Sequence, residues 1–343
     1  MSPSLDEIEA AAAIVRGVVP PTPQYRWPLL CGRLGAELWV KHENHTPIGA
    51  FKLRGGLVYL DALKRARPEL RGVITATRGN HGQSIALAAT RVGLTATIVV
   101  PHGNSVEKNR AMAAFGATLV EAGHDYQAAY EHTAALAERD RLHIVPPFDP
   151  ALVRGVATYS LELLRAVEGL DVVYVPIGLG SGISGMIAAR DALGLKTEIV
   201  GVVAANAAAY SLSFAAGRPV STNSADTIAD GLGCRVPHPE AFEIIRRGAT
   251  RIVTVTEAEI RAAMRILYTD THNVAEGAGA AALAAALQER ARLSGKRVAV
   301  IQSGGNVDRA LFADILAEEP DENRGDARQI GAQPSLSDGA GSC

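Results

Sequence analysis

Cysteines, aromatic residues and long apolar runs are all scarce in this chain. Its three cysteines (Cys31, Cys234 and Cys343) are odd in number and far apart, and no pair has the spacing of metal ligands. This argues against a disulfide framework and indicates a reducing compartment. The apolar runs are short and interrupted by Gly, Pro or charge, so no segment is expected to span a bilayer. The polar, acidic start MSPSLDEIEA does not resemble a signal peptide, so we expect a cytoplasmic protein.

An excess of one charge is missing as well. The chain has 34 Lys and Arg against 36 Asp and Glu, a formal net charge of -2. The basic residues are scattered, and no basic tract carries interleaved aromatic residues. This balance gives no bias toward nucleic acid or an anionic membrane, which leaves a small molecule as the expected partner.

The apolar residues that are present alternate between two periodicities. Short β-branched runs, such as 73–77, 96–100, 172–176 and 298–302, are separated by segments with helical spacing. Strands that read as solid apolar runs and alternate with helices predict parallel sheets covered on both faces. A chain of 343 residues is too long for one minimal core, so we expect an α/β fold with two sheets. From about residue 319 the apolar periodicity stops, and residues 319–343 are expected to be a disordered tail.

A glycine-rich loop follows one predicted strand. The segment Val172–Gly185 reads VVYVPIGLGSGISG and passes directly into a predicted helix. Glycines at a helix start allow several backbone N–H groups to point at one anion, so a phosphate is the expected ligand. The part GSGISG also matches a dinucleotide fingerprint. That hypothesis needs an acidic residue at the end of the next strand, where this chain has Ala204-Ala205-Asn206. A packing turn without a ligand is the remaining alternative.

A lysine in an unusual setting is the first candidate for chemistry. Residues 41–56 read KHENHTPIGAFKLRGG, so Lys52 follows a Pro-Ile-Gly turn and an aromatic residue and precedes Arg54-Gly55-Gly56. An isolated lysine at a helix start is normally only solvated. The residues around Lys52 are what make it a stronger candidate for a catalytic role. His42 and His45 lie in the same stretch, without the spacing H-E-x-x-H, and are expected to make local polar contacts instead of binding a metal.

Three motifs in order carry a resemblance to a known family. They are Glu43–Gly55 (ENHTPIGAFKLRG), residues 78–83 (RGNHGQ) and residues 303–306 (SGGN), with the glycine-rich loop between the second and the third. In this pattern the chain resembles the fold-type II pyridoxal-phosphate (PLP) enzymes, specifically the serine/threonine dehydratase (threonine ammonia-lyase) group. The resemblance covers about residues 20–315.

The resemblance implies a fold and a domain division. The fold would be that of the tryptophan synthase β-like enzymes, with two lobes of twisted, mainly parallel sheets flanked by helices. Residues 1–50 plus 148–318 would form a large cofactor-binding domain, and residues 51–147 a small domain. A homodimer is also expected from the family.

The resemblance further implies roles for individual residues. Lys52 would carry PLP as a Schiff base and then act as the base at Cα, and burial or a nearby cation would bring its pKa toward neutrality. Ser303 would hydrogen-bond the pyridine nitrogen, and a neutral hydroxyl there favours elimination over transamination. The other expected cofactor contacts are Phe51, Asn80, Gly178, Leu179, Gly180, Ser181 and Gly182, and the expected substrate contacts are Thr77, Arg78, Gly79 and His81.

The implied activity is a lyase reaction of amino-acid catabolism. A β-hydroxy-α-amino acid such as threonine, serine or 3-hydroxyaspartate would lose water, protonated through the cofactor phosphate, and the product would hydrolyse to a 2-oxo acid and ammonia. The alternatives with the same cofactor are a β-replacement enzyme and an amino-acid racemase. A nucleotide-binding oxidoreductase built on GSGISG is the alternative from a different class.

Two departures from the family pattern sharpen these expectations. Some relatives bind a divalent cation through acidic residues after the strand at 199–203, but residues 203–209 here (VAANAAA) contain no carboxylate, so no metal is expected.

Arg78 stands where the family usually has a small hydroxyl residue, which serves racemases as a second base. Arginine stays protonated and cannot do this. It can bind a carboxylate, so a substrate with a side-chain carboxylate is one hypothesis, and pairing of Arg78 with a structural acid or stacking on an aromatic substrate is the other.

Overall fold

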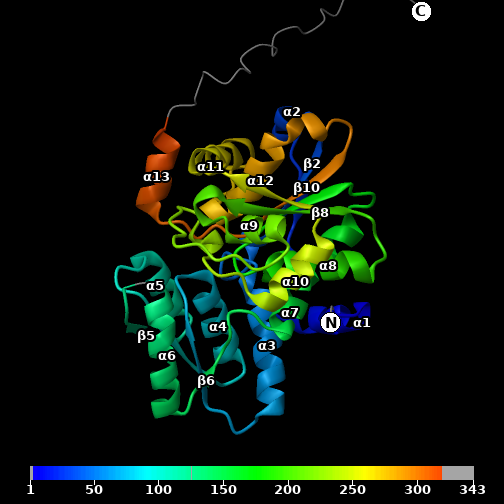
Figure 1. Ribbon diagram of the computed structural model, residues 1–343. Coiled ribbons are helices and arrows are strands. Elements are labelled where there is room, and N and C mark those ends of the chain that lie inside the picture. The colour runs from blue at the N-terminus through cyan, green and yellow to red at the C-terminus, as the bar shows by residue number, and fades with distance from the viewer. Residues whose placement is uncertain (1–2, 125, 319–343) are drawn as a thin grey trace, which may run out of the picture.

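The chain folds into two units, each built around its own β-sheet. The computed structural model describes residues 3–124 and 126–318. One sheet has six strands and the other has four. In Figure 1 the four-stranded unit lies below the six-stranded one, and the long helix α3 (Lys52–Ala66) runs down from the larger unit along the smaller one.

The larger sheet uses strands from both halves of the sequence. Its order is β1-β2-β10-β7-β8-β9, and every neighbouring pair is parallel except β1 and β2. Its strands are β1 (Gln24–Arg26), β2 (Glu37–His42), β7 (Val172–Pro176), β8 (Glu198–Ala204), β9 (Arg251–Val255) and β10 (Arg297–Gln302).

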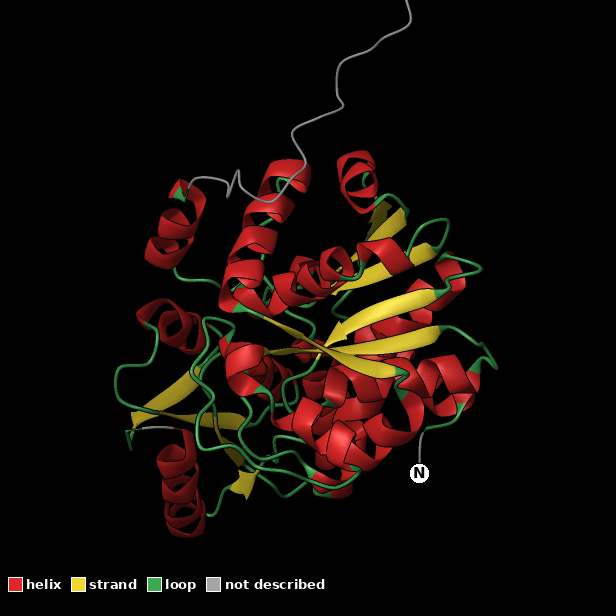
Figure 2. Cartoon of the chain, turned by 45° about the horizontal axis from the view of Figure 1, so that its top comes forward, coloured by secondary structure: helices red, strands yellow, loops and turns green. Residues whose placement is uncertain are grey.

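Helices cover both faces of this sheet, as its solid apolar strands require. Alternate residues of one strand enter different cores: Val172 and Tyr174 face one, and Val173 and Val175 face the other. Figure 2 shows the twisted sheet between its two helical layers. The first layer contains α2 (Pro28–Leu34), α11 (Glu257–Thr271), α12 (Gly277–Gln288) and α13 (Arg309–Ala317), and the second contains α1 (Leu5–Arg16), α7 (Pro150–Ala166), α8 (Ser181–Ala192), α9 (Ala209–Ala216) and α10 (Pro239–Gly248).

The smaller sheet is parallel throughout, in the order β5-β4-β3-β6. Its two apolar faces belong to separate cores, one beneath α3, α4 and α5 and the other beneath α6. The elements are β3 (Gly72–Ala76), α4 (Asn80–Arg91), β4 (Thr95–Val100), α5 (Val106–Ala114), β5 (Ala117–Glu121), α6 (Tyr126–Asp140) and β6 (His143–Ile144).

The expected α/β fold with parallel sheets is confirmed, while several elements near the N-terminus had no sequence prediction. Helix α1 is one, although Ser4 and Glu7 form a capping box that marks its start. Helix α2 and the antiparallel edge strand β1 are others, because three to seven residues give too little periodicity to recognise. The expected tail at 319–343 lies outside the described residues.

Strand register places three key segments at one edge of the larger sheet. Gln302 at the end of β10 pairs with His42 at the end of β2, and Pro176 at the end of β7 pairs with Val202. In parallel α/β sheets, ligands bind beyond these carboxyl ends. The residues that follow β2, β7 and β10 therefore meet at the place where a site is expected.

Candidate active site

Lys52 is the first residue of α3 and lies beside the end of β10. The backbone N–H of Phe51 donates to the carbonyl of Ser303 (3.0 Å), and Ala50 forms a bridge with Gly304. The amine of Lys52 lies 5.1 Å from the centre of the Phe51 ring and has no hydrogen bond to another described residue. Burial lowers the pKa of Lys52 to about 8, although the charge of Glu276 opposes the shift. The amine is therefore partly neutral near physiological pH.

The glycine-rich loop joins β7 to α8 and presents its backbone N–H groups. Gly180 has φ of +99°, which favours glycine, and a Cβ on Gly178 would lie 2.2 Å from the carbonyl oxygen of Gly231. Tyrosine hydroxyls bind two of the loop carbonyls: Tyr210 donates to Leu179 (3.0 Å), and Tyr159 donates to Gly182 (3.3 Å). Helix α8 begins at Ser181, so its first N–H groups have no carbonyl one turn earlier and can bind an anion.

Asn80 connects the smaller unit to the larger one. Its amide Nδ2 donates to Oε1 of Glu276 (2.7 Å), and its Oδ1 accepts from Nδ2 of Asn306 (2.8 Å). Asn306 also donates to the carbonyl of Ile48 (2.8 Å). Since an amide Nδ2 has two hydrogens, Asn80 keeps one donor for a ligand.

Glu276 is a buried carboxyl with one satisfied oxygen. Its Oε2 is buried and has no partner among the described residues. Burial raises the pKa of Glu276 to about 7, while the cation of Lys108 lowers it and the anion of Asp230 raises it. Lys108 lies on α5 of the smaller unit and donates to Asp230 Oδ2 at 2.5 Å. This pair is a further charged contact between the two units beside the site.

The remaining predicted residues lie on two loops around this group. Ser303 follows β10, is 4% exposed, and its hydroxyl has no hydrogen bond to another described residue. His81 lies in the first turn of α4, where burial and the nearby charge of Lys52 lower its pKa to about 3. Its Nε2 is buried without a partner in the described chain. A neutral imidazole of this kind is suited to shaping the site and not to carrying a proton.

Residues Thr77, Arg78 and Gly79 form the short turn between β3 and α4. Thr77 is buried and its Oγ1 accepts from the N–H of Gly79 (3.1 Å). Arg78 is exposed and has no ion pair or hydrogen bond to any described residue. The hypothesis that Arg78 pairs with a structural acid is therefore not supported.

Three of the neighbouring residues received little or no weight from the sequence. The sequence alone assigns no role to Lys108, Asp230 or Asn306. A signal exists for Asn306, which ends the motif SGGN. Lys108 lies in an ordinary helical segment and carries no comparable signal.

The histidines of the KHENH segment are accounted for by local contacts. The Nε1–H of Trp27 donates to Nε2 of His42 (3.0 Å), and Nε2 of His45 lies 2.7 Å from Oδ1 of Asn273. No cluster of three His, Cys, Asp or Glu side chains that could hold a metal occurs within residues 3–124 and 126–318.

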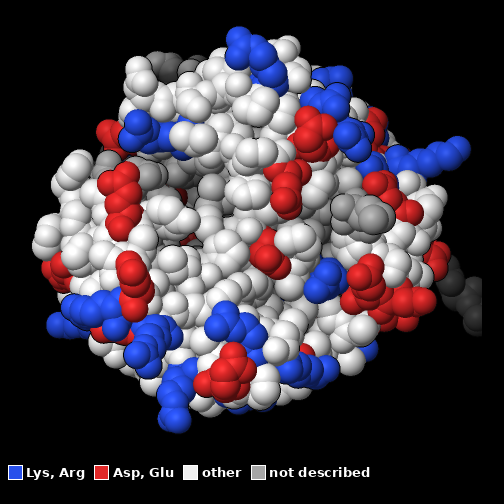
Figure 3. Space-filling model, turned by 60° about the horizontal axis from the view of Figure 1, so that its bottom comes forward, with Lys and Arg blue, Asp and Glu red and all other residues white. Residues whose placement is uncertain are grey.

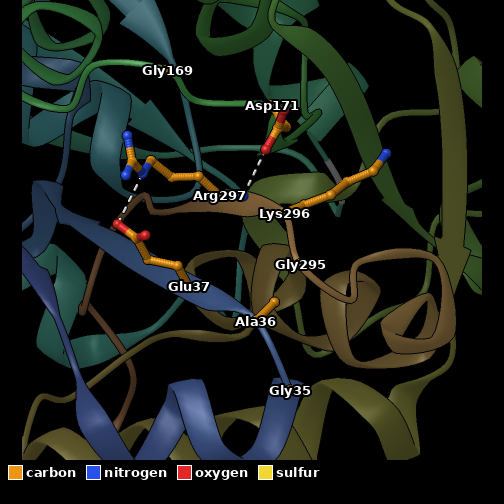
Figure 4. Close-up of a pocket in the computed structure, with 8 residues that line it drawn as sticks. All are labelled: Gly35, Ala36, Glu37, Gly169, Asp171, Gly295, Lys296 and Arg297. Atoms are coloured by element: carbon orange, nitrogen blue, oxygen red, sulfur yellow. Dashed lines mark hydrogen bonds and ion pairs between the residues drawn. The ribbon is translucent and has the colours of Figure 1, made fainter.

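A depression lies at the opposite edge of the larger sheet. It is lined by the turns that precede β2, β7 and β10, and its charged groups are already matched (Figure 4). Arg297 donates to Glu37 through Nε (2.9 Å), and its backbone N–H donates to Asp171 (2.7 Å). No comparable set of unpaired polar groups lines it, so we place the active site at the other edge.

The face of the molecule in Figure 3 offers no single-sign patch that would indicate a large charged partner. On the face in Figure 3, basic and acidic side chains are intermixed around the rim and the middle is largely uncharged. In the described part of the chain, no helix has both the length and the apolar character needed to cross a bilayer.

Comparisons with known proteins agree with the geometry. The sequence profile of the pyridoxal-phosphate-dependent enzymes matches residues 15–304. The chain belongs to this family. It is similar to an L-threonine ammonia-lyase of Thermotoga maritima (33% identity over 91% of this chain and 78% of that protein). It is also similar to an L-threo-3-hydroxyaspartate ammonia-lyase of Saccharomyces cerevisiae (33% identity over 93% and 98%). The structure of maize serine racemase superposes with a TM-score of 0.85 at 28% identity, covering 92% of this chain and 97% of that one.

The residues present fit pyridoxal phosphate, the cofactor of this family. The open N–H groups of Gly178–Gly182 suit its phosphate, and the partly neutral amine of Lys52 suits its aldehyde. The unengaged hydroxyl of Ser303 suits its ring nitrogen, and the spare hydrogen of Asn80 suits its ring hydroxyl. Phe51 lies beside the Lys52 amine, where its ring can pack against the cofactor.

Proposed function

We propose that this PLP enzyme removes water from a β-hydroxy-α-amino acid and releases a 2-oxo acid and ammonia. The names of the Thermotoga and Saccharomyces relatives support a lyase of this kind. The observation that carries the proposal is that Lys52, whose amine has no hydrogen-bond partner in the described chain, and the neutral hydroxyl of Ser303 belong to the same site. This pairing supplies a base without the carboxylate partner that would strengthen the cofactor as an electron sink.

The side chains provide the steps of an elimination. When bound, the cofactor stabilises the electron pair left at Cα after proton removal. The neutral amine of Lys52 takes the Cα proton, which its lowered pKa permits near neutral pH. The Cα electron pair forms the Cα=Cβ bond as the Cβ–O bond breaks. The leaving oxygen gains one proton, equivalent to the proton that Lys52 removed from Cα, and departs as water. The released enamine tautomerises to an imine, and water then replaces its nitrogen to give the 2-oxo acid and ammonia.

Two other outcomes with the same cofactor are less well supported. A racemase needs a proton donor on the face opposite Lys52, and Arg78 stays protonated and cannot exchange protons there. A β-replacement enzyme needs a second nucleophilic substrate, for which no described group gives evidence. The nucleotide-binding alternative drawn from GSGISG is set aside, because the family match includes that segment.

The remaining expectations are proposals about the molecule as a whole. We propose that residues 1–50 with 148–318 and residues 51–147 form the two domains, which agrees with the membership of the two sheets. We also propose a cytoplasmic homodimer. Tyr25 and Leu29, which are 50% and 60% exposed beside the edge strand β1, provide apolar surface for such a contact. Light scattering of the wild type and of a Tyr25→Asp, Leu29→Asp variant tests this, and an unchanged mass would contradict the proposed face.

A substrate panel tests the activity itself. The purified enzyme is expected to show a near-visible absorbance band that borohydride abolishes. It is then assayed with threonine, serine, 3-hydroxyaspartate and phenylserine while the 2-oxo acid and ammonia are measured together. Equal amounts of the two products from at least one substrate support the proposal. Racemised substrate without ammonia would overturn it.

A further inference from the structure

The segments that meet at the active site carry more groups suited to anions than a monocarboxylic substrate requires. The loop Gly178–Gly182 provides backbone N–H groups at the start of α8. The turn ending at Gly79 provides a second set at the start of α4, which begins at Asn80. The guanidinium of Arg78 is a third. The cofactor phosphate and a substrate α-carboxylate together account for two of them.

Arg78 is held in place by its neighbours but has no partner of its own. The N–H of Thr77 donates to the carbonyl of Val99 (3.0 Å), and the N–H of Gly79 donates to Thr77 Oγ1 (3.1 Å). Asn80 is bonded to Glu276 on the larger unit. The backbone on both sides of Arg78 is therefore fixed, while its exposed side chain makes no ion pair with a described residue.

The nearest other cation on this side of the site is already engaged. Lys108 lies against the turn, since a Cβ on Gly79 would come within 2.9 Å of its Cδ. Its amine is 2.5 Å from Asp230, and although burial opposes the charged form, Asp230 and Glu276 raise its pKa. Lys108 is thus balanced by protein carboxylates, whereas Arg78, which lies in the turn between β3 and α4, has no such partner among the described residues.

We propose that Arg78 is a specificity-determining residue that binds a second carboxylate, carried on Cβ of the substrate. This rests on the proposed elimination and specifies its substrate class as a β-hydroxy amino dicarboxylate such as 3-hydroxyaspartate. A guanidinium binds a carboxylate through two parallel N–H donors, a geometry that lysine cannot reproduce. In the reaction the Cα–H and Cβ–O bonds break and water leaves. Hydrolysis of the resulting enamine releases ammonia and a four-carbon 2-oxo dicarboxylate.

The experiment compares variants of the holoenzyme on matched substrates. Arg78→Ser removes the charge and Arg78→Lys keeps it without the planar donors. Arg91→Ser is the control, because Arg91 is exposed at the far end of α4, the helix that follows the turn, ~17 Å from Asn80 at 1.5 Å per residue. The readout is the ratio of kcat/KM for 3-hydroxyaspartate to kcat/KM for threonine. A lost charge-assisted hydrogen bond predicts that Arg78→Ser lowers this ratio about 10- to 100-fold. Arg78→Lys should lower it less, and Arg91→Ser should leave it unchanged.

A binding measurement keeps the test independent of turnover. Succinate, with two carboxylates, should raise the Tm of the wild type and of Arg91→Ser more than propionate does, and this difference should vanish in Arg78→Ser. An equal loss of kcat/KM on all substrates would overturn the proposal and assign Arg78 to the α-carboxylate or to the turn. Turnover of threonine with no preference for the dicarboxylate would overturn it while leaving the elimination intact. If no hydroxy-amino acid is turned over, the proposed function fails, and the succinate measurement still decides whether Arg78 binds a second carboxylate.

Discussion

Two groups of ionisable residues meet helix α3 within one turn, the first at Arg54 and the second at Lys52. The surroundings of the two groups differ. The first, which we call the ion network, comprises Lys41, Glu43, Arg54 and Glu162. Arg54 donates to both oxygens of Glu43 (2.8 and 3.0 Å) and to both oxygens of Glu162 (2.7 and 2.9 Å). Although burial opposes the charged form of Arg54, Glu43 and Glu162 raise its pKa.

The second group, formed by Lys52, His81 and Glu276, lacks these partners. Lys52 has no hydrogen bond from its amine to a described residue, and one polar atom each of His81 and Glu276 is buried without a partner in the described chain. Burial moves all three pKa values toward the neutral form of each group, to about 8, about 3 and about 7.

The contrast shows how one helix supports both stability and chemistry. A buried charge with all its hydrogen bonds satisfied stays ionised and fixes the backbone around it. A buried group without them becomes neutral more easily, and a neutral amine is what a base or a nucleophile requires. Arg54 therefore anchors α3 two residues beyond the amine that remains reactive.

Replacing Lys52 should have the largest effect of the changes that test this contrast between the two groups. Lys52→Ala should reduce turnover by at least the ~10²–10⁴-fold that a positioned base contributes, and should abolish the near-visible band. The Tm of the apoenzyme should not fall, because the folded pKa of Lys52 lies below the unfolded value, so its charge opposes folding at neutral pH. Steady-state kinetics and thermal unfolding measure both effects. Normal turnover in the variant would refute the assignment of Lys52.

Replacing Arg54 should mainly lower the stability of the fold, whereas replacing Lys52 should mainly lower turnover. Arg54→Met leaves Glu43 and Glu162 buried without their main partner, which should lower the free energy of unfolding by about 3–5 kcal/mol. Arg247→Met is the control, since Arg247 forms an exposed pair with Glu243, and exposed ion pairs add little to stability. Urea unfolding of both variants provides the comparison, and a similar loss in the two would mean that the ion network adds little to stability.

Neutralising Glu276 should produce a smaller change that appears only in the pH profile. The charge of Glu276 raises the pKa of Lys52, so Glu276→Gln should lower that pKa further, while the amide oxygen can still accept from Asn80. The rate at which the apoenzyme gains near-visible absorbance with pyridoxal phosphate should rise toward a plateau above about pH 8 in the wild type. The same rise should occur at lower pH in the variant. An unshifted profile would show that Glu276 does not act on Lys52.

Chelation should have the smallest effect of all these changes. The segment after β8, which includes the short 3-10 helix Ala205–Ala207, contains no carboxylate. Hard cations bind oxygen ligands that are usually charged. EDTA should therefore leave both activity and Tm unchanged. Lost activity that magnesium or calcium restores would reveal a cation site elsewhere.

The sequence predicted most of the fold because strand and helix periodicities are local properties. The buried strands β3, β4, β7 and β10 appear as continuous apolar runs, and their solid character already indicates sheets covered on both faces. The edge strand β1 did not appear, because its three residues are half-buried or exposed and show no repeat. Its antiparallel pairing follows from its position beside β2, which no local pattern encodes.

By itself the sequence determined the chemistry available at the site. The type and order of the motif residues around Lys52, Asn80, Gly178–Gly182 and Ser303 identified the family, because that chemistry needs those functional groups at those chain positions. Only the tertiary structure decided the charge states. It brought Glu276, Lys108 and Asp230 together from distant segments and left Arg78 without a partner. Burial and distance between charges set a pKa and the availability of a side chain, and neither quantity exists until the chain has folded.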